Sequence, residues 1–226
     1  MITYGASGRE VVLRAGDYEA QIVTVGAGLA GLTYRDHELI VPHRVDECPP
    51  AYLGKVLMPW PNRVAGGAYS WEGASYDLPV DEPSFGTSLH GFVAFQDWQD
   101  DRTDASSVQL STLIAARYSY PWTLLASARY RLDARAGLAV ELSATNVGQG
   151  TAPFGVGFHP YLAVDGIRAD FLELANPASI IYEADASMIP VAAHDVADFG
   201  LDFRSPAQIG EAGLDHCFAG LPPGTW

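Results

Sequence analysis

Short strand-like runs separated by turn-forming residues make up most of this chain, and in some of them apolar and polar residues alternate. The clearest cases are segments 127–132 and 140–144, in which every second residue is apolar. A period of two is typical of a strand with one face in the core and the other in solvent. No stretch keeps the spacing of an amphipathic helix beyond two turns. The pattern therefore predicts an all-β protein with an antiparallel, sandwich-like architecture.

The predicted strands are spread over the whole chain, and irregular segments lie between them. They are 10–14, 18–25, 29–34, 38–41, a hairpin of 68–71 and 75–78, then 108–114, 122–132, 138–146, 171–174 and 180–182. Segment 42–61 is proline-rich and predicts a long loop with at most brief strands, and 79–91 predicts a second irregular stretch. Polar residues 100–107 predict a surface turn. Because no linker or repeat interrupts the pattern, residues 1–226 are expected to form one domain.

The amino-acid composition limits the classes of molecule that this protein is expected to bind. Hydrophobic residues make up 48% of the chain, and 27 acidic against 13 basic residues give a formal net charge of −14 at pH 7. A field of that sign repels nucleic acid, anionic membranes and phosphorylated metabolites, so a neutral small molecule is the expected substrate. Lys55 is the only lysine, which disfavours Schiff-base chemistry.

Two cysteines, Cys48 and Cys217, are too few to predict a disulfide framework. The N-terminus lacks the basic and apolar regions of a secretory signal, and no apolar run is long enough to cross a membrane. We therefore expect a reduced, cytoplasmic protein.

Three local patterns resemble functional motifs but lack their context. Residues 26–31 match G-x-G-x-x-G, yet β-favouring residues and a turn follow where a dinucleotide site needs a helix, so a hairpin is expected. Residues 86–90 resemble a nucleophile elbow without its last glycine, which predicts that Ser88 is a loop hydroxyl. His37, His43 and Cys48 lack a metal-binding spacing and are expected to be solvated.

A histidine on a stiff backbone lies in segment 154–162, with sequence FGVGFHPYL. Gly155 and Gly157 indicate either a strand that another backbone or a ligand approaches closely, or a β-bulge. Pro160 favours an extended conformation at His159. Such a site suits proton transfer near neutral pH, and the alternative is a buried, hydrogen-bonded histidine at a strand end.

Three further polar residues stand in apolar or constrained surroundings. Arg63 follows two prolines and a tryptophan, His90 lies between Leu89 and Gly91, and Asp215 interrupts a short apolar run. The alternatives are a surface ion pair for Arg63, a loop cap for His90 and a turn for Asp215.

Four motifs in order make the chain similar to a known family. Segments 54–64 (GKVLMPWPNRV), 89–91 (LHG), 157–162 (GFHPYL) and 214–218 (LDHCF) resemble the aldose 1-epimerase (galactose mutarotase) family. The Pro-Trp-Pro-Asn-Arg form of the first motif resembles its bacterial branch. One such motif is weak evidence, whereas four in order are specific.

The resemblance implies an antiparallel β-sandwich of the galactose mutarotase type and interconversion of the α and β anomers of a free aldose. It implies that His159 is the general acid at the ring oxygen and that His90 orients the sugar. Arg63, Asn62 and Asp215 would bind sugar hydroxyls. The reaction requires neither metal nor cofactor.

The family's general base is a glutamate on strands that follow the last of these motifs, but no glutamate follows Glu211 here. Glu82 lies in another part of the pattern, in the loop before His90. The chain is therefore expected to be either a fragment of a longer protein or a truncated relative of the family, and C-terminal incompleteness is the favoured interpretation. Residues 1–226 alone are expected to be less stable than a longer protein, to self-associate and to accelerate the reaction little.

Two other functions remain open at this point. One is a non-catalytic sugar-binding protein of the same fold, and the other is a mutarotase for sugar phosphates, which the net charge disfavours. No motif specifies the sugar or the oligomeric state.

Overall fold

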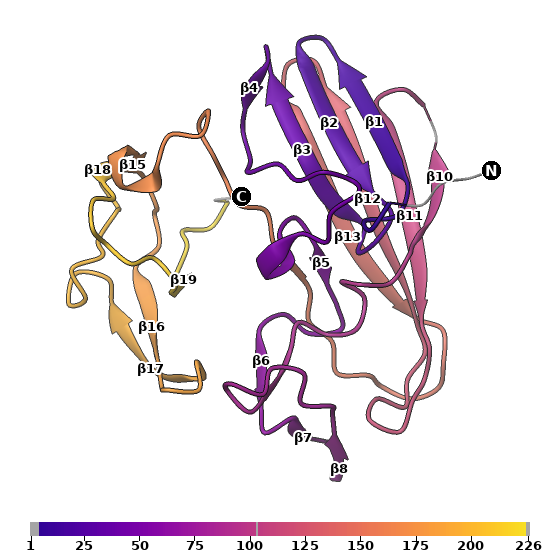
Figure 1. Ribbon diagram of the computed structural model, residues 1–226. Helices are drawn as coiled ribbons and strands as arrows, with labels where there is room; N and C mark the ends of the chain where they lie inside the picture. Colours follow the sequence, from indigo (N-terminus) through magenta and orange to yellow (C-terminus); the bar gives the residue numbers. More distant parts are fainter. Residues whose placement is uncertain (1–4, 103, 225–226) are drawn as a thin grey trace.

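The computed structural model describes residues 5–102 and 104–224 (Figure 1). Two four-stranded antiparallel sheets form its main body. The first has the order β1 (Glu10–Ala15), β2 (Tyr18–Val23), β3 (Gly28–Tyr34) and β4 (His37–Glu38). The second has the order β10 (Gln99–Arg102), β11 (Ser107–Ile114), β12 (Leu124–Asp133) and β13 (Gly137–Asn146). In the described residues the helical elements are two short 3₁₀ turns, so the all-β prediction is confirmed.

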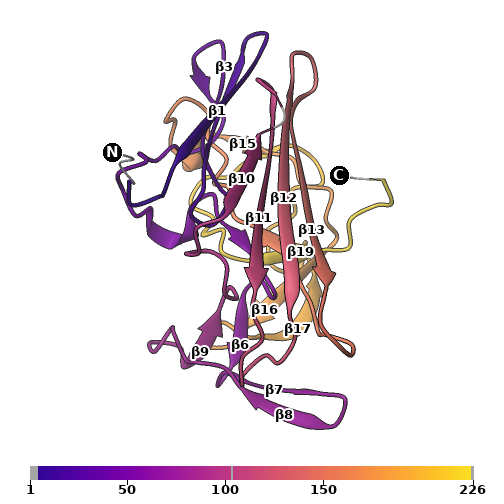
Figure 2. The same cartoon turned by 90° about the vertical axis from the view of Figure 1, so that its right-hand side faces the viewer.

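The two sheets lie face to face and bury a common core, as Figures 1 and 2 show. Leu13 and Ile22 from the first sheet and Leu110 and Tyr130 from the second are fully buried. Buried and solvent-facing positions alternate along β12, as the period of two predicts. The core thus forms where the apolar faces of the two sheets meet.

Short paired strands lie at one end of this sandwich. They are β5 (Val56–Leu57) with β14 (Gly157–Phe158), β6 (Arg63–Ala65) with β9 (Thr87–Leu89), and the hairpin of β7 (Ala68–Trp71) and β8 (Ala74–Asp77). A 3₁₀ turn, η1 (Pro50–Tyr52), precedes β5. The pairs β5–β14 and β6–β9 bring together segments that are far apart in the sequence.

The C-terminal region has a smaller core of its own and lies beside the sandwich, in orange to yellow in Figure 1. It contains η2 (Ala169–Phe171), β15 (Glu173–Leu174) paired with β18 (Ala207–Gln208), and a sheet of order β17 (Pro190–Asp195), β16 (Ile180–Ala184) and β19 (Cys217–Ala219). Ile181, Val196, Leu201 and Phe203 form its buried cluster.

Several local predictions were wrong. Residues 99–102 form β10 where a turn was predicted, because β11 offers its backbone as a pairing partner. Segment 38–41 is a strand only at its start, with Ile40 in an isolated bridge to Leu162. The predicted strand 171–174 begins as a 3₁₀ turn.

Ser88 was expected to be a loop hydroxyl and His43 a solvated loop residue, but both are buried and Ser88 lies in a strand. Ser88 is 2% exposed within β9, and His43 is 8% exposed. The glycines of segment 26–31 do connect and begin paired strands, β2 and β3, so the hairpin expected there is confirmed. Cys48 and Cys217 are both free and exposed.

Candidate active site

A cavity of about 560 Å³ lies where the strand pairs at the end of the sandwich meet the segment before β19. That volume is in the range of small-molecule sites. All five residues singled out in the sequence line it: Asn62, Arg63, His90, His159 and Asp215. Segments separated by more than a hundred positions therefore contribute to one site.

His159 is fixed through its backbone. Its N–H donates to the carbonyl of Lys55 at 3.0 Å, and its own carbonyl accepts from Gly54 at 2.8 Å. The preceding β14 pairs with β5, and a Cβ added at Gly157 would lie only 2.8 Å from a side-chain carbon of Pro61. The glycine predicted to allow a close approach thus makes room for this proline ring.

His90 is locked to Asn62 by two hydrogen bonds. The N–H of Asn62 donates to Nδ1 of His90, and the N–H of His90 donates to the carbonyl of Asn62, both at 2.9 Å. Burial, with smaller effects of the charges on His159 and Arg63, lowers the pKa of His90 to about 4. At neutral pH the ring is therefore uncharged, and because Nδ1 accepts a hydrogen bond, the proton is on Nε2.

The two imidazoles lie next to each other in the lining of the cavity. Their ring centroids are 5.3 Å apart, and the ring planes are inclined by 78°. Tyr52 packs against His90 at 4.6 Å, and Tyr161 packs against His159 at 5.3 Å. Tyr52 lies edge to face with His90, whereas Tyr161 is tilted against His159, and these contacts keep both imidazoles within reach of one small ligand.

Arg63 and Glu82 form a two-pronged ion pair at the cavity wall. Arg63 Nε donates to Oε2 of Glu82 at 2.7 Å, and a terminal nitrogen donates to Oε1 at 2.8 Å. The side chains are only 18% and 16% exposed, and Thr87 adds a 2.7 Å hydrogen bond to Oε2. The hydrogen bonds from Arg63 are the main cause of a lowered Glu82 pKa. This pair is more buried than the surface ion pair that the sequence left open.

Asp215 approaches the cavity from the C-terminal side, in the segment before β19. Its backbone N–H donates to Gly213 at 3.3 Å. Within residues 5–102 and 104–224, its carboxylate accepts no hydrogen bond. Both of its oxygens therefore remain available to a ligand.

Lys55 lies outside the cavity despite its place in the first motif. It is 1% exposed, and its Nζ donates to the carbonyl of Val25 at 2.7 Å. Burial lowers its pKa to about 8. The part of the chain that the structure describes also holds no group of three or more metal-binding side chains.

Sequence reasoning missed the tyrosines and the ion pair of the site. Tyr52, Glu82 and Tyr161 all line the cavity. Glu82 was correctly placed in the loop before His90, but its contact with Arg63 depends on the antiparallel pairing of β6 and β9. No spacing along the chain reveals that register.

Similarity to known proteins agrees with this geometry. A model of the aldose 1-epimerase family matches residues 9–224. The chain is also 43% identical over 212 residues to the uncharacterized protein YihR of Escherichia coli K12, an alignment that covers 94% of this chain and 69% of YihR. The chain belongs to the aldose 1-epimerase family.

Solved structures share the aldose 1-epimerase fold with this chain. A GalM/aldose epimerase homologue from C. elegans matches with a TM-score of 0.82 at 25% identity, covering 92% of this chain and 67% of that chain. Galactose 1-epimerase from Lactobacillus acidophilus NCFM matches with a TM-score of 0.79 at 24% identity, covering 89% of this chain and 62% of that chain. The predicted galactose mutarotase-type fold is therefore confirmed. This chain spans about two thirds of the length of each of these relatives.

No helix among the described residues has the length and apolar character needed to cross a bilayer.

Proposed function

We propose that this protein is an aldose 1-epimerase that interconverts the α and β anomers of a neutral, free aldose. The observation that carries the proposal is the meeting of two imidazoles, 5.3 Å apart, in one cavity that also contains two carboxylates and an arginine. Such a constellation combines proton-transfer groups with hydrogen-bonding groups suited to a polyhydroxylated ring.

The reaction needs a base and an acid acting on one sugar. The base removes the proton of the C1 hydroxyl while the acid protonates the ring oxygen, and the C1–O5 bond breaks to give the open-chain aldehyde. Rotation about the C1–C2 bond and reclosure give the other anomer. We assign the acid to His159, as the family resemblance implies. A positioned acid or base contributes on the order of 10²–10⁴-fold to the rate.

His90 acts as a hydrogen-bond donor in this proposal. Its pKa of about 4 keeps the ring neutral, and Nδ1 already accepts from Asn62. The Nε2–H is therefore the group that His90 can offer to the sugar near its anomeric centre. A neutral second imidazole also leaves His159 free of a fixed positive charge beside it.

Arg63, Asn62 and Asp215 are proposed to bind the sugar hydroxyls. A guanidinium has five N–H donors, and Arg63 uses three of them on Glu82 and Asn62. The remaining donors suit hydroxyl oxygens, while the unpaired carboxylate of Asp215 suits hydroxyl protons. Glu82 is the positioning residue that holds Arg63 in this orientation.

We assign the general base to no residue of the described chain. Both carboxylate oxygens of Glu82 accept hydrogen bonds from Arg63, and the lowered pKa of Glu82 makes it a poor proton acceptor. The family resemblance places the base on a glutamate later in the chain order than Asp215.

Two rival functions make different demands on the cavity. A sugar phosphate needs cationic groups, but the one guanidinium that lines the described cavity is already neutralised by Glu82. A non-catalytic sugar-binding protein would use the same hydrogen-bonding groups without proton transfer. Such a sugar-binding protein differs from an enzyme only in that it does not increase the rate of anomer interconversion.

The test combines polarimetry with calorimetry. Polarimetry follows the mutarotation of freshly dissolved α-D-glucose and α-D-galactose, and calorimetry measures the binding of each sugar. We expect the protein to accelerate the interconversion of the anomers. Binding without acceleration supports the sugar-binding rival, and the absence of both binding and acceleration overturns the proposal.

A further inference from the structure

Residues with a left-handed backbone gather around the cavity of the candidate active site. Among the described residues, ten that are not glycine have a positive φ. Four of the ten line this cavity: Ala51 (φ 50°), Tyr52 (φ 55°), Asn62 (φ 58°) and His90 (φ 61°). Such a backbone is unfavourable for a residue with a Cβ and persists only where the surrounding structure imposes it. Its concentration at one cavity indicates that the placement of these side chains matters for function.

The turn that carries Tyr52 is tied to the backbone of the active site. The left-handed backbone at Asn62 and His90 accompanies the two hydrogen bonds that join these residues. The carbonyl of Tyr52 accepts from the N–H of Lys55 at 3.0 Å, and the carbonyl of Lys55 accepts from the N–H of His159 at 3.0 Å. Two consecutive hydrogen bonds therefore connect the turn of Tyr52 to the backbone of His159.

The ring of Tyr52 lies against the imidazole of His90. The two rings meet edge to face, with centroids 4.6 Å apart and ring planes inclined by 70°. Phe95 packs against Tyr52 in turn, with a centroid separation of 5.2 Å. The hydroxyl of Tyr52 has no hydrogen-bond partner among the described residues. It is therefore the ring of Tyr52, and not its hydroxyl, that contacts His90.

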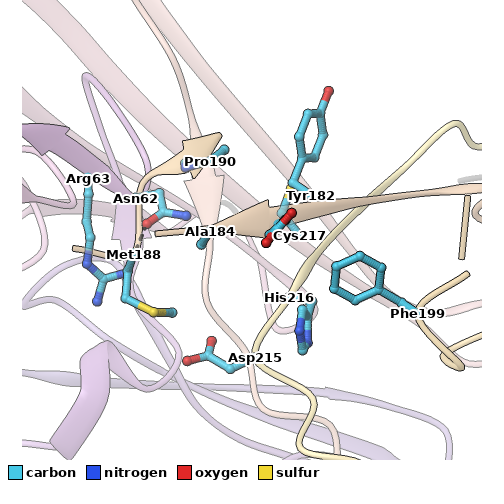
Figure 3. A pocket seen from close by; sticks show the side chains of 11 residues that line it. Asn62, Arg63, Tyr182, Ala184, Met188, Pro190, Phe199, Asp215, His216 and Cys217 are labelled. Carbon is cyan, nitrogen blue, oxygen red and sulfur yellow. Dashed lines mark hydrogen bonds between the residues drawn. The ribbon is translucent and has the colours of Figure 1, made fainter. Parts of the chain in front are cut away.

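Open space adjoins the hydrogen-bond partner of His90. A second cavity of about 500 Å³ lies beside the first, and three residues line both: Asn62, Arg63 and Asp215. Figure 3 shows Asn62 on one side of this second cavity and Phe199 and His216 on the other. Because solvent can reach Asn62 from this space, the burial of His90 depends on its other neighbours.

The charge of the His90 imidazole depends on that burial. Burial is the largest cause of its pKa of about 4, the charges of His159 and Arg63 lower the pKa further, and the charge of Glu82 raises it. Another carboxylate nearby is Asp81, which accepts a hydrogen bond from the backbone N–H of the residue before His90 at 2.8 Å. An apolar ring against the imidazole favours the neutral form, because it keeps water away from the charged form.

We propose that Tyr52 is a positioning residue, whose ring holds the His90 imidazole in place and screens it from water. Tyr52 acts through His90, which offers its Nε2–H to the sugar. A charged His90 would carry a proton on Nδ1, and the hydrogen bond from the N–H of Asn62 would then be lost, because both partners would be donors. This inference rests on the proposed function, in which His90 meets a sugar.

The first measurement is an NMR titration of the imidazole of His90, assigned with a His90→Gln variant. Tyr52→Ala should raise the pKa of His90 from about 4 toward the ordinary histidine value of about 6.5, whereas Tyr52→Phe keeps the ring and should leave the pKa low. Tyr118→Ala is the matched control, because Tyr118 is exposed and lines neither cavity. An unchanged His90 pKa in folded Tyr52→Ala overturns the inference.

The second measurement is the pH dependence of kcat by polarimetry. A histidine with an ordinary pKa is mostly charged at pH 5, so Tyr52→Ala should lose on the order of tenfold in kcat at pH 5, beyond any loss at pH 7.5. Tyr52→Phe should restore the pH profile of the unaltered protein. If Tyr52→Phe behaves as Tyr52→Ala does, the hydroxyl is the functional group, and the role of the ring is overturned.

Phe95→Ala provides the test if Tyr52→Ala does not fold. Phe95 is 57% exposed and lines neither cavity, so its removal leaves the core intact. It should loosen the ring of Tyr52 and raise the pKa of His90 by a smaller amount, and no change would overturn the inference.

The two proposals fail separately. The absence of acceleration by the unaltered protein overturns the proposed function, whereas the NMR titration does not depend on turnover. Acceleration by the unaltered protein, together with an unchanged His90 pKa in the variants of Tyr52 and Phe95, overturns the role of Tyr52 alone.

Discussion

The sandwich and the C-terminal region contribute to the same cavity but differ in how firmly they hold their residues. The sandwich core draws on both four-stranded sheets, whereas the C-terminal cluster consists of Ile181, Val196, Leu201 and Phe203. A small cluster has less apolar burial to oppose local opening. We expect the C-terminal region to be the more easily deformed of the two.

The same difference appears in the side chains of the site. On the sandwich side, His90 is bonded to Asn62 and Arg63 is bonded to Glu82. On the C-terminal side, the Asp215 carboxylate has no partner among the described residues. The sandwich wall of the cavity is therefore suited to proton transfer, because proton transfer depends on fixed geometry. The C-terminal wall is suited to binding ligands whose shape varies.

The largest effect is expected for the acid on the sandwich wall. His159→Asn should lower kcat by about 10²–10⁴-fold with little change in KM, because an acid acts chiefly in the transition state. Polarimetry over a range of sugar concentrations measures both constants. His37→Asn is the control, since that histidine is exposed and lies outside the cavity. An unchanged kcat would remove His159 from the mechanism.

The next effect tests the two cores directly. Leu110 is fully buried between the sheets, and Leu110→Ala should lower the free energy of unfolding by about 2–5 kcal/mol. Leu201 is 9% exposed in the smaller cluster, and Leu201→Ala should cost less, because its surroundings can relax into the space. Urea denaturation followed by circular dichroism measures both changes. Equal costs would contradict the proposed difference between the regions.

A smaller effect is expected for the binding residue on the C-terminal wall. Asp215→Asn removes a charged hydrogen-bond acceptor and should raise KM about tenfold while kcat changes little. Polarimetry again separates the two constants, with Asp170→Asn as a control outside both cavities. A fall in kcat comparable with that of His159→Asn would instead identify Asp215 as a proton-transfer group.

The smallest effect concerns the ion pair that holds Arg63. Because the Glu82 pKa is lowered in the folded protein, its ionised form stabilises the fold above the pKa of an unfolded glutamate, about 4.3, and this contribution is lost as the pH falls through the folded value. Glu82→Gln should therefore reduce stability at pH 7 by on the order of 1 kcal/mol.

Urea midpoints measured between pH 3 and pH 7 check this expectation for Glu82→Gln, with Glu72→Gln as a control on an exposed turn. The difference between Glu82→Gln and the unaltered protein should shrink as the pH falls below about 4.3, where the glutamate of the unfolded chain becomes protonated, and further as the pH passes through the lower pKa of the folded state. A difference that is independent of pH would show that the ion pair contributes through packing alone.

Local physical chemistry made much of this molecule predictable. Runs of β-favouring residues between turn residues identified β1 to β3 and β11. Alternating apolar residues identified β12 and β13, because a strand with one buried face repeats every two residues in any tertiary context. The four ordered motifs identified Asn62, Arg63, His90, His159 and Asp215, all of which line one cavity.

The contacts between distant segments were decided only by the tertiary structure. β10 was missed because its strand form depends on backbone pairing with β11, and not on its own polar side chains. The bond between Glu82 and Arg63 depends on the register of β6 against β9. The second cavity exists because the C-terminal region lies against Asn62 and Arg63. The sequence determined which segments become strands and which residues carry the chemistry, whereas folding alone determined which side chains meet, because residues distant along the chain are brought together only by three-dimensional packing.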